Sequence, residues 1–440
     1  MAPPSDVAAA PGDDYAAPRA ARQGRGAPWT FWRKLAAASG PGYLVAVGYM
    51  DPGNWATGLA GGSVFGYRLL GVVVLANLMA MVLQSLAARL GIASGMDLAQ
   101  ACRARYGPAI RVPLWILCEI AIIACDLAEV LGSAIALQLL FHVPLPLGVG
   151  LTCLDVLLIL TLQRRGLGKL EAFVVALIAM IGACFAVELL MAQPSLAGMV
   201  AGLAPRAEII TNPAMLYIAV GILGATVMPH NLYLHSSVVQ ARPYPRTTEG
   251  KRDAVRFASL DSTIALGFAL LINAAILILA AASFHHPGQT TAVGIQDAYR
   301  LLSPVLGVGA ASLLFGVALL AAGQNATITG TLAGQIVIEG FTNFRMPPWA
   351  RRLVSRLIAV APAAIIAALY GADGVGKLLI GSQVVLSLQL PFAVVPLILI
   401  TSDRKVMGEL ANTRAQRSVY WVIAATLVAL NGALLVMLVR

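Results

Sequence analysis

Two short polar interruptions occur inside long apolar segments of this chain, and both have the form x-Pro-x-Asn. The first is Asp-Pro-Gly-Asn at 51–54, within an apolar run over 41–66. The second is Met-Pro-His-Asn at 228–231, within a run over 214–240. In lipid, a backbone N–H or C=O without a partner costs several kcal/mol, so a broken helix persists only where the freed groups line a cavity or bind a ligand. The Asp, Asn and Met residues at these points indicate a metal cation as that ligand.

The first interruption supplies a carboxylate and an amide. Pro52 removes a backbone donor and Gly53 permits an irregular backbone, so Asp51 and Asn54 lie beside freed carbonyl groups. An ionised Asp near the middle of a membrane costs about 2.5–3.5 kcal/mol, and a divalent cation would offset that cost. The structural alternative is a kinked helix in which Asp51 only caps the turn.

The second interruption supplies a sulfur atom and a carbonyl oxygen. Met228 takes the place that Asp51 has in the first interruption, and Pro229 frees carbonyl groups one turn earlier, near Ala225. A thioether disfavours Ca²⁺ and Mg²⁺ and tolerates Mn²⁺, Fe²⁺, Co²⁺ and Cd²⁺. A methionine in an apolar helix is more often core filler, and the position of Met228 beside Pro229 is what favours a ligand role.

Titratable residues follow the second interruption and line the third apolar segment. His230 and His235 indicate proton relay or gating at least as strongly as packing. Glu119, Asp126 and Glu129 are spaced so that all three lie on one helical face, where buried carboxyl groups can pass protons. The alternative is a set of ion pairs with basic residues at the start of the ninth segment, namely Arg351, Arg352 or Arg356.

Other polar residues inside the apolar segments are more often interhelical hydrogen bonds than ligands. They are Gln84, Asn273, Gln383 and Gln389, and Gln383, beside Gly381-Ser382, is the best of them to contact a cation. Asp155 has no role that the sequence assigns. The five cysteines form no C-x-x-C pair, and we predict that they are reduced core residues.

The composition requires a polytopic membrane protein. The chain is 59% hydrophobic and 11% charged, with a mean hydropathy of +0.82, whereas soluble domains carry about 25% charged residues. A spanning helix needs about 20 apolar residues. By that measure the sequence predicts eleven spans, at 41–66, 69–92, 113–138, 146–163, 170–192, 213–240, 257–284, 305–340, 353–370, 376–400 and 418–439.

The net charge of +10 encodes topology. With a cytoplasmic N-terminus, most Lys and Arg residues fall in the tail and in the cytoplasmic loops, as the positive-inside rule requires. This placement argues against a nucleic-acid surface and puts the C-terminus outside the cell. Residues 1–34 lack an apolar core, which is typical of a disordered cytoplasmic tail rather than a secretory signal. We predict that residues 35–440 form a single transmembrane domain.

The two interruptions stand in corresponding places of two halves. Five spans begin before the second interruption, and five more begin with it, which leaves 418–439 as an extra helix. An odd number of spans per half means that the second half, about 213–400, is inverted relative to the first, about 41–192. Inverted repeats with broken helices are typical of secondary transporters, whose binding site lies between the repeats.

Three blocks in this chain resemble the Nramp (natural resistance-associated macrophage protein) family of divalent-metal transporters. They are the two interruptions, the second extended through Ser236, and a block over 323–335, in the cytoplasmic extension of the eighth span, where Asn325-Ala326 replaces the more usual Ser-Ser or Ser-Thr. The resemblance covers about 35–440. It implies an all-α, LeuT-like 5+5 inverted repeat with discontinuous helices 1 and 6.

The resemblance also implies a function in the inner (plasma) membrane of a bacterium. The expected activity is import of Mn²⁺ or Fe²⁺, often with a proton, without a cofactor or an obligatory protein partner. The implied metal ligands are Asp51, Asn54, Met228 and the Ala225 carbonyl. The implied proton route runs through Asp51, His230, Asp126 and Glu129. Family members that transport Mg²⁺ lack the methionine.

Three rival functions are weaker. An amino-acid or other organic-solute symporter of the same fold would place Asp51 beside a substrate carboxylate, which is repulsive. A membrane metalloenzyme lacks support because no H-E-x-x-H or G-x-S-x-G motif is present. A channel would not saturate or alternate between two access states. No nucleotide-binding G-x-x-x-x-G-K-[ST] motif is present either, so an ion gradient must drive transport.

Overall fold

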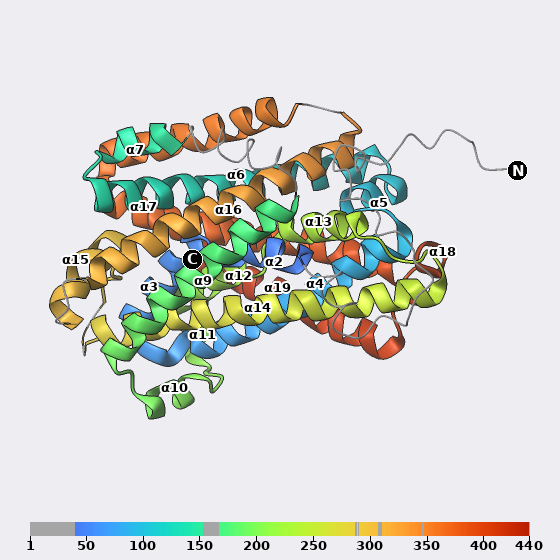
Figure 1. Ribbon diagram of the computed structural model, residues 1–440. Helices are drawn as coiled ribbons and strands as arrows, with labels where there is room; N and C mark the ends of the chain where they lie inside the picture. Colours follow the sequence, from blue (N-terminus) through green and yellow to red (C-terminus); the bar gives the residue numbers. More distant parts are fainter. Residues whose placement is uncertain are drawn as a thin grey trace, which may run out of the picture.

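The computed structural model describes residues 40–152, 167–286, 288, 290–306, 310–344 and 347–439. Over these residues the chain is helical, and the long helices run roughly side by side in one bundle (Figure 1). The predicted tail and most of the predicted fourth span, with Asp155, lie outside the described residues.

The helices follow one another as the alternation of apolar segments and polar loops predicts. In chain order they are α2 (Pro41–Ala46), η1 (Val47–Met50), α3 (Pro52–Phe65), η2 (Gly66–Leu69), α4 (Leu70–Ser94), α5 (Leu98–Arg105), α6 (Pro108–Phe141), α7 (Leu145–Leu151), α9 (Leu167–Ala192), α10 (Leu196–Gly202), α11 (Glu208–Thr211), α12 (Pro213–Thr226), α13 (Pro229–Val238), η4 (Val239–Ala241), α14 (Thr248–Phe284), α15 (Ile295–Leu306), α16 (Ala311–Thr342), α17 (Pro348–Thr401), α18 (Arg404–Met407), η5 (Gly408–Leu410) and α19 (Arg414–Val439).

Nine stretches of the described residues are helices long and apolar enough to cross a membrane. One of them, Pro52–Ser94, contains both the second half of the predicted first span and the second span, which meet at Gly66 with a φ of 61°. Another element, α17, holds the predicted ninth and tenth spans, joined at Gly371, where φ is 58° and the backbone leaves the helical region. Glycine alone adopts such φ values readily. Each predicted span outside the undescribed segment 153–166 is therefore matched by an apolar helix.

Both predicted interruptions break their helices. Asp51 has an extended backbone (φ −70°, ψ 165°) between η1 and α3, and its side chain accepts a hydrogen bond from the Asn54 backbone N–H. The second break contains Val227 and Met228, with ψ of 61° and 120°, between α12 and α13. A proline opens each of the helices that follow, where its missing N–H has no helical acceptor to lose.

The broken helices lie between two groups of long helices (Figure 1). On one side α14 packs along α3 and α4, and on the other α16 and α17 pack along α6. The contact between α3 and α6 is close because Gly132 faces the Pro52 ring, and a Cβ at Gly132 would overlap that ring. The half-helices are thus held against long neighbouring helices.

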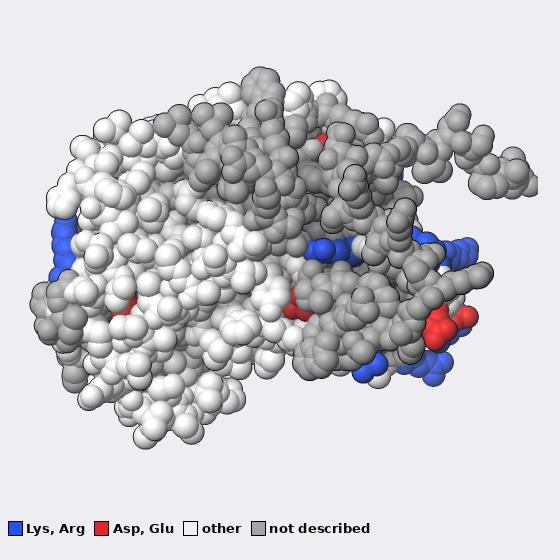
Figure 2. All heavy atoms as spheres, viewed as in Figure 1, with Lys and Arg blue, Asp and Glu red and all other residues white. Residues whose placement is uncertain are grey.

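Charged side chains are sparse over much of the described surface seen in Figure 2. Figure 2 shows Lys and Arg gathered mainly toward the end of this face that carries α18, with a wide, mostly uncharged surface between the two ends. This distribution fits a bundle whose middle faces lipid.

Candidate metal site

The two interruptions meet in the interior of the protein. Asn54 Nδ2 donates a hydrogen bond to the Ala225 carbonyl oxygen at 2.8 Å, and Thr226 Oγ1 donates to Asn54 Oδ1 at 3.3 Å. Asp51 is 0% exposed and Asn54 is 5% exposed. Residues 171 positions apart in the chain are therefore joined directly, as the matched interruptions predict.

Two acceptor oxygens, one from each broken helix, lie around the Asn54 side-chain amide. Its Nδ2 donates both to Asp51 Oδ1 and to the Ala225 carbonyl, each at 2.8 Å. The other carboxylate oxygen, Asp51 Oδ2, has no hydrogen-bond partner among the described residues. A carboxylate and a carbonyl gathered in this way suit a divalent cation, toward which Asn54 would turn its own oxygen.

Met228 brings the sulfur atom to the second interruption. It is fully buried, and its Sδ accepts a weak hydrogen bond from Asn231 Nδ2 at 3.6 Å. In the described part of the chain no three His, Cys, Asp or Glu side chains form a ligand cluster. The candidate ligands at the two breaks are instead a carboxylate, an amide, a carbonyl and a thioether, a mixture that suits transition metals better than Ca²⁺ or Mg²⁺.

Gln383 of α17 lies against both broken helices. A Cβ placed on Gly53 would overlap the Gln383 side-chain amide, and one placed on Gly224 would overlap the Gln383 backbone carbonyl. The Gln383 Nε2 donates to Ser382 Oγ at 2.9 Å, and within the described residues its Oε1 has no partner. The structure therefore places this predicted ligand beside the first break, with a free oxygen.

Two acidic residues of α6 form separate ion pairs with arginines of α17. Glu129 faces the Arg356 guanidinium at 3.4 Å, and both side chains are fully buried. Arg356 also reaches Thr327 Oγ1 at 3.4 Å and the Thr152 carbonyl at 3.5 Å. Glu119, two to three turns away, is paired with Arg351 at 2.9 Å. Both carboxylates are thus ion-paired, and the side chain of the third candidate cation, Arg352, lies outside the described residues.

The third family-like block explains how α16 accommodates these charges. A Cβ at Gly330 would lie 2.8 Å from Glu129 Oε1 and 3.3 Å from Asp126 Oδ1. A Cβ at Gly334 would overlap the Arg351 guanidinium. These glycines are needed for close approach, because any side chain would occupy the space that the buried charges fill.

The two histidines have different surroundings. His230 is fully buried, its ring nitrogens have no hydrogen-bond partner among the described residues, and its helix α13 packs against α6, which carries Asp126. His235 Nδ1 lies 3.0 Å from Gln84 Oε1, and Gln84 Nε2 donates to the Tyr49 hydroxyl at 2.6 Å. The structure therefore brings His230 toward the α6 carboxylates. His235 belongs instead to a separate hydrogen-bond chain that joins α13, α4 and η1.

The predicted interhelical role of two amides is confirmed by their contacts. Gln84 takes part in the chain just described, and Asn273 Nδ2 donates to the Tyr49 backbone carbonyl at 2.8 Å. Together these bonds fix η1, the turn that leads into the first break. The sequence named the amides but not their common partner, because a tyrosine in an apolar segment carries no distinct signal.

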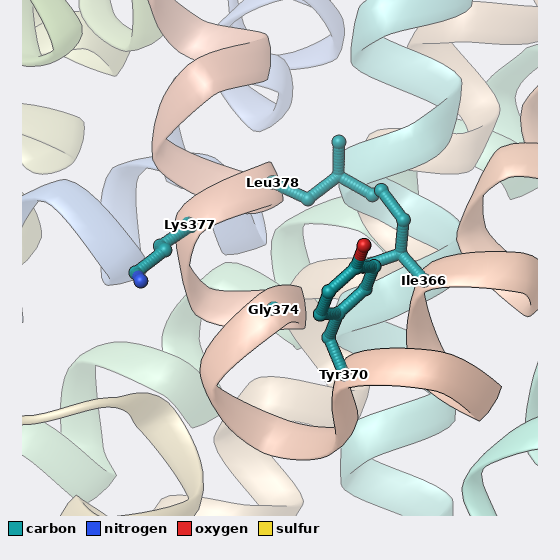
Figure 3. A pocket seen from close by; sticks show the side chains of 5 residues that line it. All are labelled: Ile366, Tyr370, Gly374, Lys377 and Leu378. Atoms are coloured by element: carbon teal, nitrogen blue, oxygen red, sulfur yellow. The ribbon is translucent and has the colours of Figure 1, made fainter.

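A surface hollow of about 610 Å³ lies away from these residues. It is lined by Ile366, Tyr370, Gly374, Lys377 and Leu378, at the turn between the two parts of α17. Figure 3 shows the Lys377 side chain pointing away from the Tyr370 ring. None of its lining residues belongs to the broken helices. The candidate metal site is enclosed in this arrangement, because its ligands are buried.

Comparison with known proteins agrees with this geometry. The family described as natural resistance-associated macrophage protein-like (Nramp) matches residues 42–437. A divalent metal cation transporter, MntH, from Xanthomonas campestris pv. campestris is 60% identical over 411 residues, which are 93% of this chain and 92% of that protein.

Solved structures show the same fold. A manganese transporter from Eremococcus coleocola, in complex with an aromatic bis-isothiourea substituted compound, has a TM-score of 0.85 and 43% identity, over 92% of this chain and 87% of that one. Mhp1, a nucleobase-cation-symport-1 family transporter in a closed conformation, has a TM-score of 0.59 at 16% identity, over 90% of this chain and 91% of that one. The second likeness shows the fold alone, and it confirms the predicted LeuT-like architecture with discontinuous helices.

Proposed function

Because this chain belongs to the Nramp family, we propose that it is a secondary transporter, not an enzyme, that imports Mn²⁺ and related divalent transition metals by alternating access. The observation that carries this proposal is the convergence of Asp51, Asn54 and the Ala225 carbonyl at the meeting point of two broken helices. Two half-helices that share one site can rock about it and expose it to either side in turn.

The proposed ligands are Asp51, Asn54, Met228 and the Ala225 carbonyl, with Gln383 completing the shell when the site is closed. One carboxylate partly neutralises a divalent ion, and a soft sulfur atom selects against Ca²⁺ and Mg²⁺. The cation is cargo rather than a resident cofactor. Uptake of Mn²⁺ into proteoliposomes tests the proposal: Cd²⁺ should compete, and amino acids should not.

The proposed setting is a bacterial inner membrane with a cytoplasmic N-terminus. The end of the bundle that carries the basic residues near α18 then lies inside, and the C-terminal helix α19 ends outside. Two positive charges that move inward gain about 4.6 kcal/mol at 100 mV, inside negative. The membrane potential alone therefore favours import, and a proton that moves with the metal adds its own gradient.

Replacing Met228 with alanine is expected to change selectivity more than activity. Mn²⁺ accepts oxygen ligands, so its uptake remains measurable, whereas Ca²⁺ and Mg²⁺ become competitors once the sulfur is gone. The measurement is Mn²⁺ uptake against increasing Ca²⁺ or Mg²⁺. Met215→Ala is the matched control, because Met215 is equally buried in α12 but outside the break. Unchanged selectivity in Met228→Ala would remove sulfur from the proposed shell.

The proposed proton route leads from the metal site through His230 and Asp126 to Glu129 and Arg356. His230 follows the second break, and Asp126 and Glu129 face the same glycine of α16. In a buried ion pair such as Glu129 with Arg356, each charge is compensated only while both partners remain ionised. Protonation of Glu129 would break its ion pair with Arg356. Proton movement along this route could thereby change the packing of α6 against α17.

Asp126→Asn is expected to flatten the dependence of uptake on external pH more than it weakens metal binding. The amide preserves the shape of the side chain but cannot exchange a proton at these pH values. Initial uptake rates over a range of external pH, together with the Mn²⁺ dissociation constant, separate the two effects. Asp297→Asn, at an exposed position on α15, serves as the control. Equal losses of affinity and pH dependence would contradict a relay.

A further inference from the structure

Glu188 is a buried carboxyl group that the proposed mechanism does not use. It lies four residues before the end of α9, its side chain is 0% exposed, and neither carboxyl oxygen has a hydrogen-bond partner among the described residues. An unpaired polar group inside a membrane protein is costly and is seldom retained without a function. Glu188 therefore differs from Glu119 and Glu129, which are ion-paired.

The two helices that pack most extensively against α9 carry no cationic side chain over long stretches. α9 packs against α14 and α16 and, less extensively, against α2 and α15. The stretches 264–284 of α14 and 311–338 of α16 contain no titratable residue. The packed elements and their ends do carry titratable or charged groups elsewhere, among them Tyr43 on α2, Asp297, Tyr299 and Arg300 on α15, and His285 and His286 after α14, and α9 itself carries Cys184 one turn before Glu188.

None of these groups satisfies the carboxyl. His285 is engaged by the Ser63 carbonyl, with its Nδ1 at 2.9 Å, and Asp297 and Arg300 are exposed. An ionised carboxylate in apolar surroundings without a counter-charge is so unfavourable that the group takes up a proton instead. Glu188 is therefore neutral in this closed arrangement of the helices.

An aromatic cluster connects Glu188 to the metal site. Phe185 lies on the same face of α9, one turn earlier, and its ring centroid is 4.8 Å from that of Trp55. Trp55 follows Asn54 in α3 and also contacts Phe315 of α16, at 5.1 Å. A movement of α3 relative to α9 must repack this cluster and thereby change the surroundings of Glu188.

We propose that Glu188 is a further proton-binding site of this protein, protonated while Trp55 of α3 contacts Phe185 of α9 and deprotonated to water when these two aromatic side chains separate. On release, the carboxyl O–H bond breaks and the proton passes to water on the side where α9 ends. That side also holds η2, whose Tyr67 hydroxyl accepts a hydrogen bond from the Ser195 N–H at 3.2 Å, and it is the extracellular side in the proposed orientation. The coupling of this proton to transport rests on the proposed function, whereas the binding of the proton does not.

The test of proton binding uses the full-length protein in lipid nanodiscs without metal. Infrared difference spectra over a pH titration report protonated carboxyl groups through their carbonyl stretching band. Glu188→Gln should lose one such band component, and Glu188→Asp should retain a shifted one. Glu208→Gln is the matched control, because Glu208 is exposed and paired with Arg68 at 3.0 Å. Identical spectra for Glu188→Gln and the unsubstituted protein would overturn the proposal.

The test of coupling uses Mn²⁺ uptake by the same variants at varied external pH. One linked proton changes the slope of log uptake by up to about one unit per pH unit, so Glu188→Gln should have a flatter profile than Glu208→Gln. An unchanged profile would refute the coupling of Glu188 to transport. A profile that is flat in every variant, including the unsubstituted protein, would refute proton coupling itself and leave the infrared result standing.

Discussion

Uptake of Mn²⁺ is expected to fall at least about a hundredfold when Asp51 is replaced by asparagine. Asp51 supplies the only full negative charge among the proposed ligands, and a buried charge deprived of its counter-charge costs about 3–5 kcal/mol. Each 1.4 kcal/mol corresponds to a factor of ten in the dissociation constant. The fold should survive, because an asparagine at this position can still accept the hydrogen bond from the Asn54 backbone N–H.

Calorimetric titration of Mn²⁺ into purified Asp51→Asn, alongside uptake by the reconstituted protein, checks this expectation. The control is Asp297→Asn, which changes the net charge by the same amount at an exposed site on α15. A folded Asp51→Asn protein that binds Mn²⁺ as tightly as the control would show that the carboxylate is only a cap of α3. That outcome would support the kinked-helix alternative.

The second large effect is expected from Gly224→Ala, one residue before the proposed carbonyl ligand. A Cβ at Gly224 would overlap the backbone carbonyl of Gln383 and approach the Ser387 backbone N at 2.7 Å. Backbone atoms of a packed helix cannot rotate aside, so α12 must shift away from α17, at a cost of about 1–3 kcal/mol. The Ala225 carbonyl and Gln383 then separate, and we expect uptake to drop by at least about tenfold, in line with that cost.

Gly267→Ala provides the matched control, because Gly267 lies in the membrane-spanning α14 and a Cβ added there would meet open space. Thermal unfolding in detergent and uptake in proteoliposomes should be measured for both variants. We expect Gly224→Ala to remain folded with a lowered melting temperature and little transport. Normal transport by Gly224→Ala would mean that the contact between α12 and α17 does not fix the site.

The sequence was sufficient to predict the breaks and the spans, for physical reasons. Apolar runs of sufficient length must be helices in lipid, and the polar x-Pro-x-Asn form around Pro52 and Pro229 indicates where two of them are interrupted. The encounter of Asn54 with Ala225 could also be predicted, because inverted halves bring corresponding breaks together. These inferences depend on local chemistry and on topology, both of which can be read from one sequence.

Other parts of the site depend on tertiary neighbours and could not be predicted. Glu119, Asp126 and Glu129 do share a helical face, but only the packing of α6 against α17 assigns Arg351 to the first and Arg356 to the last. His235 follows His230 by little more than one turn, yet it contacts Gln84 of α4.

The burial of Glu188 could not be predicted from the sequence for a related reason. Near the end of an apolar segment, a single glutamate is compatible with an exposed position at the membrane surface. Its burial depends on tertiary packing, in which α9 lies against α14 and α16. Similarly, the sequence does not indicate why residue 330 is a glycine. The reason is the close approach of two carboxyl groups, which only the structure shows.

X-ray absorption spectroscopy of the purified protein loaded with one equivalent of Cd²⁺ tests the central claim most directly, because it reports the atoms around the bound ion. If both interruptions hold the metal, the first shell contains oxygen atoms and one sulfur atom, and Met228→Ala loses the sulfur while Met215→Ala retains it. A shell without sulfur in the unsubstituted protein, or a sulfur that persists in Met228→Ala, would contradict the claim that the second break binds the ion.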